Sequence, residues 1–373
     1  MIYFDNAATG GKKPEAVLVA ANAAIRLCAN PGRSSHRLSL ACANEILSCR
    51  KLLAEHFDCD SFENVVFTKN CTEALNIAIF GALNQGDHVV TTCMEHNSVL
   101  RPLHQLAKQG YLSYDICPLR GGNISPKELA SFVKPSTKAV IVTTASNVTG
   151  ATPDLLAIKK LLPENVLLIC DGAQGGGHLP LKMRQAGIDI LCLAGHKGLL
   201  GIQGSGALLF SSRVSLRPLL FGGTGSLSYT LDMPDFSPDS LEAGTLNYPA
   251  IAALKAGVAY LSLHEREIGE KLRRLTALTV RGLKRFRGVR VYSEPNPCGI
   301  VAMSHENKQS EYLALLLSQK YDIATRGGLH CAPLMHEALG TADEGLLRIS
   351  FSHENTEKEV DALLASLQEI FSL

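Results

Sequence analysis

The stretch that decides the fold, residues 65–92, reads VVFTKNCTEALNIAIFGALNQGDHVVTT. Short runs rich in β-branched residues stand at its two ends, at Val65–Thr68 and His88–Thr92, and predict strands. Between them, over Thr72–Leu83, apolar residues recur at spacings of three and four, which predicts a helix. A strand, a helix and a second strand in this order indicate parallel strands joined by a crossover helix.

The same alternation continues to residue 210. Further strands are predicted at Leu112–Cys117, Ala139–Thr144, Val166–Asp171, Ile190–Ala194 and Ala207–Phe210. Further helices are predicted at Ser98–Lys108, Ser125–Val133 and Asp154–Leu162. We therefore expect an α/β fold with a mainly parallel sheet that helices cover on both faces. Ligands of such sheets bind at the carboxyl ends of the strands, so the residues that follow each strand carry the functional signal.

The pattern changes after residue 210. Gly222–Pro249 is rich in Gly, Ser, Pro and Asp and predicts a long irregular loop, which inside a compact protein is usually functional. A long helix is predicted over Pro249–Arg285. After it we predict strands and helices at Gly299–Ser304, Ser310–Gln319, Asp322–Thr325, Leu346–Phe351 and Thr356–Phe371. Thr356 and Glu359 form a capping box for the last helix. We predict a large domain over residues 15–250 and a smaller C-terminal α+β domain over 251–373, which residues 1–14 join.

Charge and cysteine content exclude several classes of protein. Lys and Arg number 36 against 35 Asp and Glu, a formal charge of +1, so no basic field is available for nucleic acid. No apolar run approaches the roughly 18 residues that span a bilayer, so we expect no membrane association. The eleven cysteines include no C-x-x-C, which argues against a metal site or a disulfide framework. So many unpaired thiols, with no signal-peptide pattern at the start, predict a reducing, cytoplasmic location.

Polar residues follow several of the predicted strands. The turn before the first helix carries Cys71 and Thr72, where free N–H groups and the helix dipole favour an anion. Taken alone, Thr72 is better explained as a simple helix cap. His96, Asp171 and Lys197 follow three later strands. Each has an ordinary structural explanation when taken alone. Their common placement at one sheet edge favours a shared functional site.

A lysine at the end of a buried strand is unusual unless its amine is used. Burial lowers the pKa of an amine and makes it a nucleophile towards carbonyl groups. A Schiff-base lysine, an aspartate that can pair with a ring nitrogen, and an anion site together suit pyridoxal 5'-phosphate. The sequence therefore predicts this cofactor, with Lys197 and Asp171 as its main ligands.

Motifs that belong to one family stand along essentially the whole chain. They are Asp5-Asn6-Ala7-Ala8-Thr9, Asn30-Pro31, Ser35-His36-Arg37, Cys71-Thr72-Glu73-Ala74, Glu95-His96-Asn97, Ser146-Asn147-Val148-Thr149-Gly150, Asp171-Gly172-Ala173-Gln174, Gly195-His196-Lys197, Glu242-Ala243-Gly244-Thr245 and Arg326-Gly327-Gly328-Leu329-His330-Cys331-Ala332. With them the sequence resembles the class V aminotransferases, and within these the cysteine desulfurases of the SUF-type branch. The resemblance implies the pyridoxal-phosphate-dependent transferase fold of type I.

The resemblance also implies roles around the cofactor ring. Lys197 would bind pyridoxal phosphate covalently, and Asp171 would pair with the ring nitrogen and keep it protonated. Gln174 would hydrogen-bond the ring oxygen, and His96 would stack on the ring face.

At the phosphate end, the resemblance implies contacts from the backbone N–H of Cys71 and from Thr72 and His196. Thr245 would reach the phosphate from a neighbouring subunit, which implies a homodimer with shared active sites.

For the substrate, the resemblance implies that Asn147 and Arg348 bind the carboxylate, a task for which an arginine fork is suited. Cys331 would attack the sulfur of L-cysteine, which leaves L-alanine and an enzyme persulfide for a sulfur-acceptor protein and for iron–sulfur cluster assembly. His330 would act there or only shape the loop.

Cys331 differs from the other cysteines in its context. Two glycines precede it and Arg326 and His330 stand near it, which favours an exposed thiolate. The default for the remaining cysteines is a small buried apolar residue, with Cys71 expected to act mainly through its backbone.

Three other functions compete with that of a desulfurase. A selenocysteine lyase on the same scaffold, acting on L-selenocysteine, stays open because selenium leaves more easily than sulfur. A nicotinamide dehydrogenase lacks support, since no G-x-G-x-x-G stands between the first strand and helix. A catalytically silent scaffold protein is disfavoured by the presence of Lys197 and Cys331.

Overall fold

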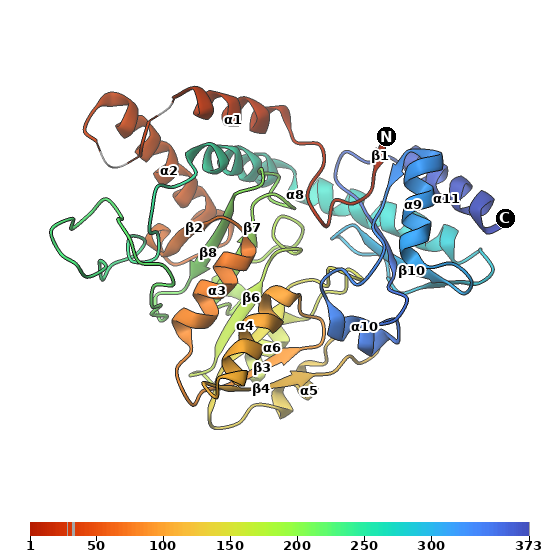
Figure 1. Ribbon diagram of the computed structural model, residues 1–373, viewed down its shortest axis with the longest axis horizontal. Helices are drawn as coiled ribbons and strands as arrows, with labels where there is room; N and C mark the ends of the chain where they lie inside the picture. The colour runs from red at the N-terminus through yellow and green to blue at the C-terminus, as the bar shows by residue number, and fades with distance from the viewer. Residues whose placement is uncertain (28, 32–33, 373) are drawn as a thin grey trace.

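The computed structural model describes residues 1–27, 29–31 and 34–372. Figure 1 shows two parts: one holds a large sheet with its helices, and the other holds a small sheet, the C-terminal helices and both chain ends. The long helix α8 (Tyr248–Leu283) runs from the first part into the second. No helix within the described ranges is both long and apolar enough to cross a membrane.

The large sheet has seven strands in the order β2-β8-β7-β6-β5-β3-β4. They are β2 (Val65–Thr68), β3 (His88–Thr92), β4 (Ser113–Cys117), β5 (Thr137–Thr143), β6 (Leu167–Asp171), β7 (Ile190–Ala194) and β8 (Gly206–Phe210). Neighbouring strands from β4 to β7 are parallel, and β8 runs antiparallel to both β7 and β2. The predicted mainly parallel sheet is therefore confirmed, with strand ends within a few residues of those predicted.

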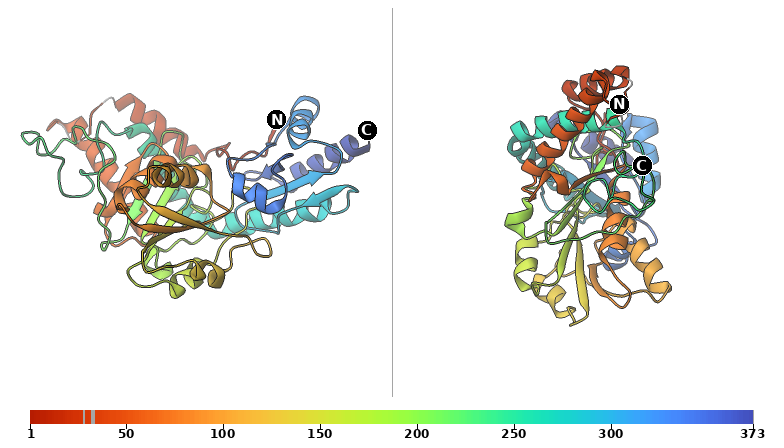
Figure 2. Two further views of the ribbon diagram at one scale, coloured as in Figure 1. Left: turned by 60° about the horizontal axis from the view of Figure 1, so that its bottom comes forward. Right: turned by 90° about the vertical axis from the view of Figure 1, so that its left-hand side faces the viewer.

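Helices cover both faces of this sheet. Its strands alternate their apolar side chains between two cores: Leu168 of β6 points into one and Ile169 into the other. The helices of this part are α1 (Glu15–Leu27), α2 (Arg37–His56), α3 (Cys71–Ala82), α4 (Asn97–Lys108), α5 (Pro126–Ser131), α6 (Leu155–Leu161) and α7 (Met183–Ala186), with the 3-10 turn η1 (Phe62–Asn64). Helices α3 and α4 pack on one face, and α2, α6 and α8 pack on the other. Figures 1 and 2 show α1 lying outside, beside α8.

The second part is built around an antiparallel sheet of order β12-β10-β9. Its elements are β9 (Val289–Val291), β10 (Ile300–His305), α9 (Ser310–Tyr321), β11 (Ile323–Ala324), α10 (Pro333–Leu339), β12 (Leu347–Ser350) and α11 (Glu357–Ser372). The N-terminal strand β1 (Ile2–Tyr3) pairs with β11. The capping box of α11 is confirmed, since Thr356 N–H donates to Glu359 Oε2 at 2.8 Å. The boundary near residue 250 remains our proposal, supported by the separate sheets.

The chain between β8 and α8 is irregular, as predicted, although α8 begins one residue earlier than expected. This loop, residues 211–247, extends away from the sheet at the left of Figure 1. A buried ion pair holds its end: Arg50 of α2 binds Glu242 through two contacts of 2.8 Å, and both side chains are only 7% exposed. Glu242 Oε1 also accepts the N–H of Phe67 in β2 at 2.6 Å. The pair therefore joins the loop to a helix and a strand.

Replacing Arg50 with Met should destabilise the protein, because it leaves the Glu242 carboxylate buried without its cation. Breaking such a pair from one side lowers the free energy of unfolding by about 3–5 kcal/mol. Urea unfolding followed by circular dichroism would measure this as a lower midpoint. The exposed Arg120, paired with Glu128 at the surface, gives the matched control, and Arg120→Met should leave the midpoint nearly unchanged. Equal effects of the two substitutions would contradict the anchoring role.

Candidate active site

A hollow of about 490 Å³ opens at the carboxyl ends of the large sheet's strands. Its lining residues are Asn70, Cys71, Thr72, Leu75, His96, Ser98, Thr143, Asn147, Asp171, Ala173, Gln174, Ala194, His196 and Lys197. Eight of the predicted site residues are among them. The structure thus brings together, from the ends of five strands, the residues that we expected at one edge of the sheet.

Lys197 lies in the turn that follows β7, with a half-buried side chain. Burial lowers the pKa of its amine, an effect that the Asp171 carboxylate opposes and that the Arg348 and Arg326 guanidinium groups reinforce. A lowered pKa increases the fraction of neutral amine, the form that reacts with a carbonyl group.

Asp171 ends β6 and is only 3% exposed. Its Oδ1 accepts the N–H of Ala173 at 2.9 Å and the S–H of Cys71 at 3.4 Å. Burial raises the pKa of Cys71 well above its ordinary value, so the group stays a neutral thiol and a donor. We expected Cys71 to act through its backbone, and the contact of its thiol with Asp171 is an addition. Among the described residues no hydrogen bond reaches Asp171 Oδ2, which leaves that oxygen for a ring N–H of pyridoxal phosphate.

The anion end of the hollow is the first turn of α3. The helix cap is Asn70, whose Oδ1 accepts the N–H of Glu73 at 2.9 Å, so the alternative that Thr72 is the cap is wrong. Thr72 lies inside the first turn, exposed, with its hydroxyl 2.8 Å from Ser98 Oγ. The N–H groups of this turn point to the helix end, where an anionic group is stabilised. This arrangement fits the phosphate of the predicted cofactor.

Two imidazoles of the hollow are held in defined orientations. His96 caps α4, and its Nδ1 accepts the N–H of Ser98 at 3.0 Å, which places the proton of the neutral ring on Nε2. His196 Nδ1 lies 3.0 Å from Thr9 Oγ1. Burial lowers the pKa of His96, and burial together with Lys197 and Lys13 lowers that of His196 to about 4. Both rings are therefore neutral hydrogen-bonding groups near neutral pH.

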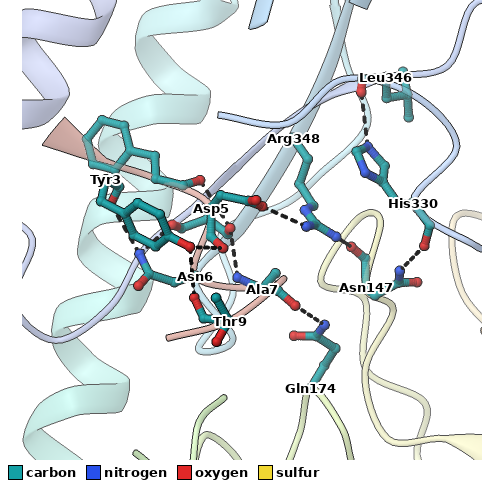
Figure 3. A network of polar contacts seen from close by, with 12 residues as sticks. Tyr3, Asp5, Asn6, Ala7, Thr9, Asn147, Gln174, His330, Leu346 and Arg348 are labelled. Atoms are coloured by element: carbon teal, nitrogen blue, oxygen red, sulfur yellow. Dashed lines mark hydrogen bonds and ion pairs between the residues drawn. The ribbon is translucent and has the colours of Figure 1, made fainter. Parts of the chain in front are cut away.

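Gln174 is oriented by the N-terminal segment. Its Nε2 donates to the Ala7 carbonyl oxygen at 2.9 Å, as Figure 3 shows, and the side chain is 4% exposed. One of its two amide hydrogens is thus used by the protein. The second can meet the ring oxygen of a bound cofactor.

The predicted nucleophile lies at the mouth of the hollow. Cys331 lines a neighbouring groove of about 960 Å³ that shares Thr72, His96 and Ser98 with the hollow, so the two are continuous. It is exposed, whereas the other described cysteines are buried, as expected for structural thiols: Cys42, Cys49, Cys59, Cys71, Cys93, Cys117, Cys170, Cys192 and Cys298. Cys28 lies outside the described residues. Cys331 thus differs from the other described cysteines in having an exposed thiol beside the site.

Arg348 and Thr245 lie outside the hollow. Arg348 is 2% exposed, and its Nη2 contacts Asp5 Oδ1 at 2.9 Å while Nη1 donates to the Asn147 carbonyl oxygen at 3.0 Å (Figure 3). Arg348 therefore fixes the backbone of Asn147, whose side chain lines the hollow. Thr245 is exposed and lines a separate hollow with Glu242. Asp5 was not predicted as a site residue, although the Asp5-Asn6 motif carries that signal.

Glu95 is a further buried group, to which the sequence assigns no role although it belongs to the Glu95-His96-Asn97 motif. Its Oε1 accepts the hydroxyl of Thr92 at 2.6 Å and the N–H of Thr143 at 2.9 Å, so it joins the ends of β3 and β5 directly before His96. Its Oε2 is buried and has no partner among the described residues. Burial raises the pKa of this carboxyl to about 8.

The pH dependence of stability should report the Glu95 proton. The folded state holds this proton up to about pH 8, whereas the unfolded chain releases it near 4.5, so stability falls as pH rises between these values. Glu95→Gln removes this loss. The stability of the variant relative to wild type should therefore increase from about pH 5 to about pH 8, by as much as about 1 kcal/mol per pH unit.

Urea midpoints at the two pH values measure this difference, with the exposed Glu15→Gln as a control that should show none. Parallel pH profiles for wild type and Glu95→Gln would mean that the carboxyl is already ionised.

Comparisons with known proteins agree with this geometry. The aminotransferase class-V family model matches residues 2–363. A probable cysteine desulfurase from Methanothermobacter thermautotrophicus is 32% identical over 352 residues, which are 92% of this chain and 88% of the relative. Cysteine desulfurase CsdA from Escherichia coli is 29% identical, over 100% of this chain and 94% of its own.

Solved structures of cysteine desulfurases also match over the whole chain. The apo structure of cysteine desulfurase from Thermococcus onnurineus has a TM-score of 0.91 and 29% identity, and the match covers 100% of this chain and 94% of the other. The predicted type I transferase fold is thereby confirmed. The whole-chain match and the fit of Asp171, Lys197 and the α3 terminus to the cofactor lead to one conclusion: the chain belongs to the pyridoxal-phosphate-dependent aminotransferase class-V family.

Proposed function

We propose that this protein is a cysteine desulfurase that converts L-cysteine to L-alanine and keeps the sulfur as a persulfide on Cys331. The reaction balances without an external oxidant: the substrate C–S bond breaks, an S–S bond forms on Cys331, and a hydrogen replaces sulfur on the substrate. The relatives named cysteine desulfurase support this proposal. An aminotransferase would not need a thiol at this position.

The observation that carries the proposal is the position of Cys331. Its thiol is exposed, and it lines a groove that meets the Lys197 hollow at His96 and Thr72. A nucleophile at the entrance can approach the sulfur of a substrate that is held inside. Orientation of two reacting groups in this way removes a large part of an activation barrier.

The residues of the hollow suit the cofactor and its chemistry. Pyridoxal phosphate, when bound, supplies an electron sink for the negative charge that develops on the substrate. Lys197 would hold it, Asp171 Oδ2 would meet its ring nitrogen, and Gln174 and His96 would position the ring. The lowered pKa of Lys197 lets its Nζ accept and return the α-proton of the substrate.

Contacts to the phosphate and to the substrate complete the proposed site. The first turn of α3, with Cys71 N–H and Thr72, and the neutral His196 would bind the phosphate. Asn147, which lines the hollow, would bind the substrate carboxylate with the support of Arg348.

We also propose a homodimer in which Thr245 completes the site of the neighbouring subunit. Two features support it: Thr245 is exposed and away from the Lys197 hollow of its own chain, and the loop 211–247 displays large apolar side chains. Phe221 is 77% exposed, and Tyr229 and Leu231 are fully exposed. Apolar groups in such number favour an interface. The persulfide sulfur would pass to an acceptor protein, for iron–sulfur cluster assembly, in the cytoplasm, where free thiols persist.

Borohydride reduction should fix the cofactor to Lys197. The purified protein loaded with pyridoxal phosphate should be yellow, and reduction should bleach the colour because the carbon–nitrogen double bond to the lysine is removed. Peptide mass spectrometry should then find the adduct on Lys197. Lys13, whose pKa burial lowers to about 8, is the internal comparison, and an adduct there would overturn the assignment.

Cys331→Ser should abolish alanine formation from L-cysteine without changing the absorbance of the bound cofactor. Sulfide is a poor leaving group without a thiolate to accept the sulfur, whereas selenide leaves more easily, so the variant should keep substantial activity on L-selenocysteine. Wild type treated with L-cysteine should gain about one sulfur atom, on the Cys331 peptide, that reductant removes.

The matched control is Cys59→Ser, since Cys59 is a buried thiol that lines neither the hollow nor the groove. It should retain desulfurase activity. Full turnover of L-cysteine by Cys331→Ser would refute the proposal, and a preference of wild type for L-selenocysteine over L-cysteine would favour the lyase alternative.

A further inference from the structure

The backbone at the proposed nucleophile has an uncommon conformation. His330 and Cys331 have φ angles of +51° and +57°, so two consecutive residues with side chains lie in the left-handed region. Residues other than glycine rarely adopt it, and they stay there only when surrounding contacts hold them. The contacts that hold this pair therefore set the position of the thiol.

Three hydrogen bonds hold the two residues, and each comes from a different segment. The N–H of Asn97, at the start of α4, donates to the Cys331 carbonyl oxygen at 2.8 Å. Asn147 Nδ2 donates to the His330 carbonyl oxygen at 2.6 Å, and His330 Nε2 donates to the Leu346 carbonyl oxygen at 3.0 Å. Only the bond from Asn147, among these three, joins a side chain to the peptide group directly before Cys331.

Asn147 is itself fixed. Arg348 Nη1 donates to its carbonyl oxygen, and Arg348 is paired with Asp5, so a continuous chain of contacts runs from Asp5 to the loop of Cys331 (Figure 3). Asn147 is only 8% exposed. Arg348 therefore fixes the backbone of Asn147, and the His330 carbonyl oxygen fixes its side chain.

The amide of Asn147 has a second hydrogen. Because a carbonyl oxygen only accepts, the atom that faces His330 must be the nitrogen, and this contact uses one of its two hydrogens. Asn147 also lines the hollow that contains Lys197. One amide group thus touches the loop of the nucleophile and the space where the proposed substrate binds.

We propose that Asn147 is a positioning residue for Cys331: one amide N–H holds the peptide before the nucleophile, and the other binds the substrate carboxylate. The inference rests on the proposed function, in which Cys331 attacks a bound substrate. Asn147 would then position both reacting partners. Of the three hydrogen bonds that hold the loop, this is the one that also links the position of the thiol to that of the substrate. A shift of about 1 Å between reacting groups can lower a rate about 100-fold.

The test compares Asn147→Ala and Asn147→Asp with wild type, all loaded with pyridoxal phosphate. Alanine removes the side chain, and aspartate keeps its shape but cannot donate. In both, without substrate, backbone hydrogen exchange of the peptide that contains residues 328–333 should be at least about tenfold faster. The rate at which iodoacetamide alkylates Cys331 should change with it, while the cofactor absorbance stays the same.

Kinetics separate positioning from substrate binding alone. A residue that only binds the substrate raises KM and leaves kcat unchanged. Positioning of the thiol requires that kcat for L-cysteine also falls, by about 100-fold. Asn76→Ala is the matched control: Asn76 lines the Cys331 groove, but its amide donates to the Thr72 carbonyl oxygen at 2.8 Å and not to the loop. It should leave hydrogen exchange at residues 328–333 unchanged.

Wild-type exchange and alkylation rates in both Asn147 variants would overturn the inference, whatever happens to turnover. The exchange experiment needs no substrate, so it separates the two proposals. A wild-type protein without activity on L-cysteine would refute the proposed function, while faster exchange in the Asn147 variants would still establish the tether.

Discussion

The placement of the half-buried Lys197 and the buried Asp171 at one sheet edge is the constraint on which the rest of the site depends. Two ionisable groups removed from water are stabilised only if further polar contacts accompany them. The structure supplies these contacts from the adjacent turns, with Ala173 N–H and the Cys71 thiol on Asp171 Oδ1. Parallel pairing of β6 with β7 brings the carboxyl ends of these two strands side by side, and the helices on both faces keep water from the strands beneath.

The N-terminal segment connects the two parts of the molecule at this site. Asp5 pairs with Arg348 of β12, the Ala7 carbonyl oxygen accepts from Gln174, and Thr9 contacts His196. Residues more than 160 positions apart in the sequence thus orient one another. The short strand β1 and its pairing with β11 hold the segment in place, so a two-residue strand has a large effect on the active site.

Local patterns predict much of this protein because its large sheet has a strong signal. Except for the edge strand β4, the strands from β2 to β8 are short, largely buried runs, and the polar residues of the site follow directly after them. Helices α1 and α2 and the strands β1 and β9 were not predicted. Strands of two or three residues have no period to detect, and α1 exposes apolar side chains such as Leu18 and Val19 that blur its pattern.

The contacts that sequence reasoning missed in the site are those between distant segments. Asn70 rather than Thr72 caps α3, and this depends on the side-chain rotamer of Asn70. The Cys71 thiol contacts Asp171, which lies 100 residues away in the sequence. The bond from Asn147 to His330 spans 183 residues. No spacing rule contains such information, whereas the gathering of residues at one sheet edge follows from strand order alone.

The electrostatics of the site follow from the same burial. Burial lowers the pKa of His96, His196 and His330, so these imidazoles are neutral near neutral pH. The fixed positive end that an anion in the hollow would meet is the first turn of α3, and its partial charge does not change with pH. Neutral imidazoles beside this helix end can orient a cofactor and a substrate without competing for the proton that Lys197 would move in the proposed reaction. The helix end thus supplies a constant partial charge, and the imidazoles supply neutral hydrogen-bond donors. Proton exchange during the proposed reaction is left to the Lys197 amine.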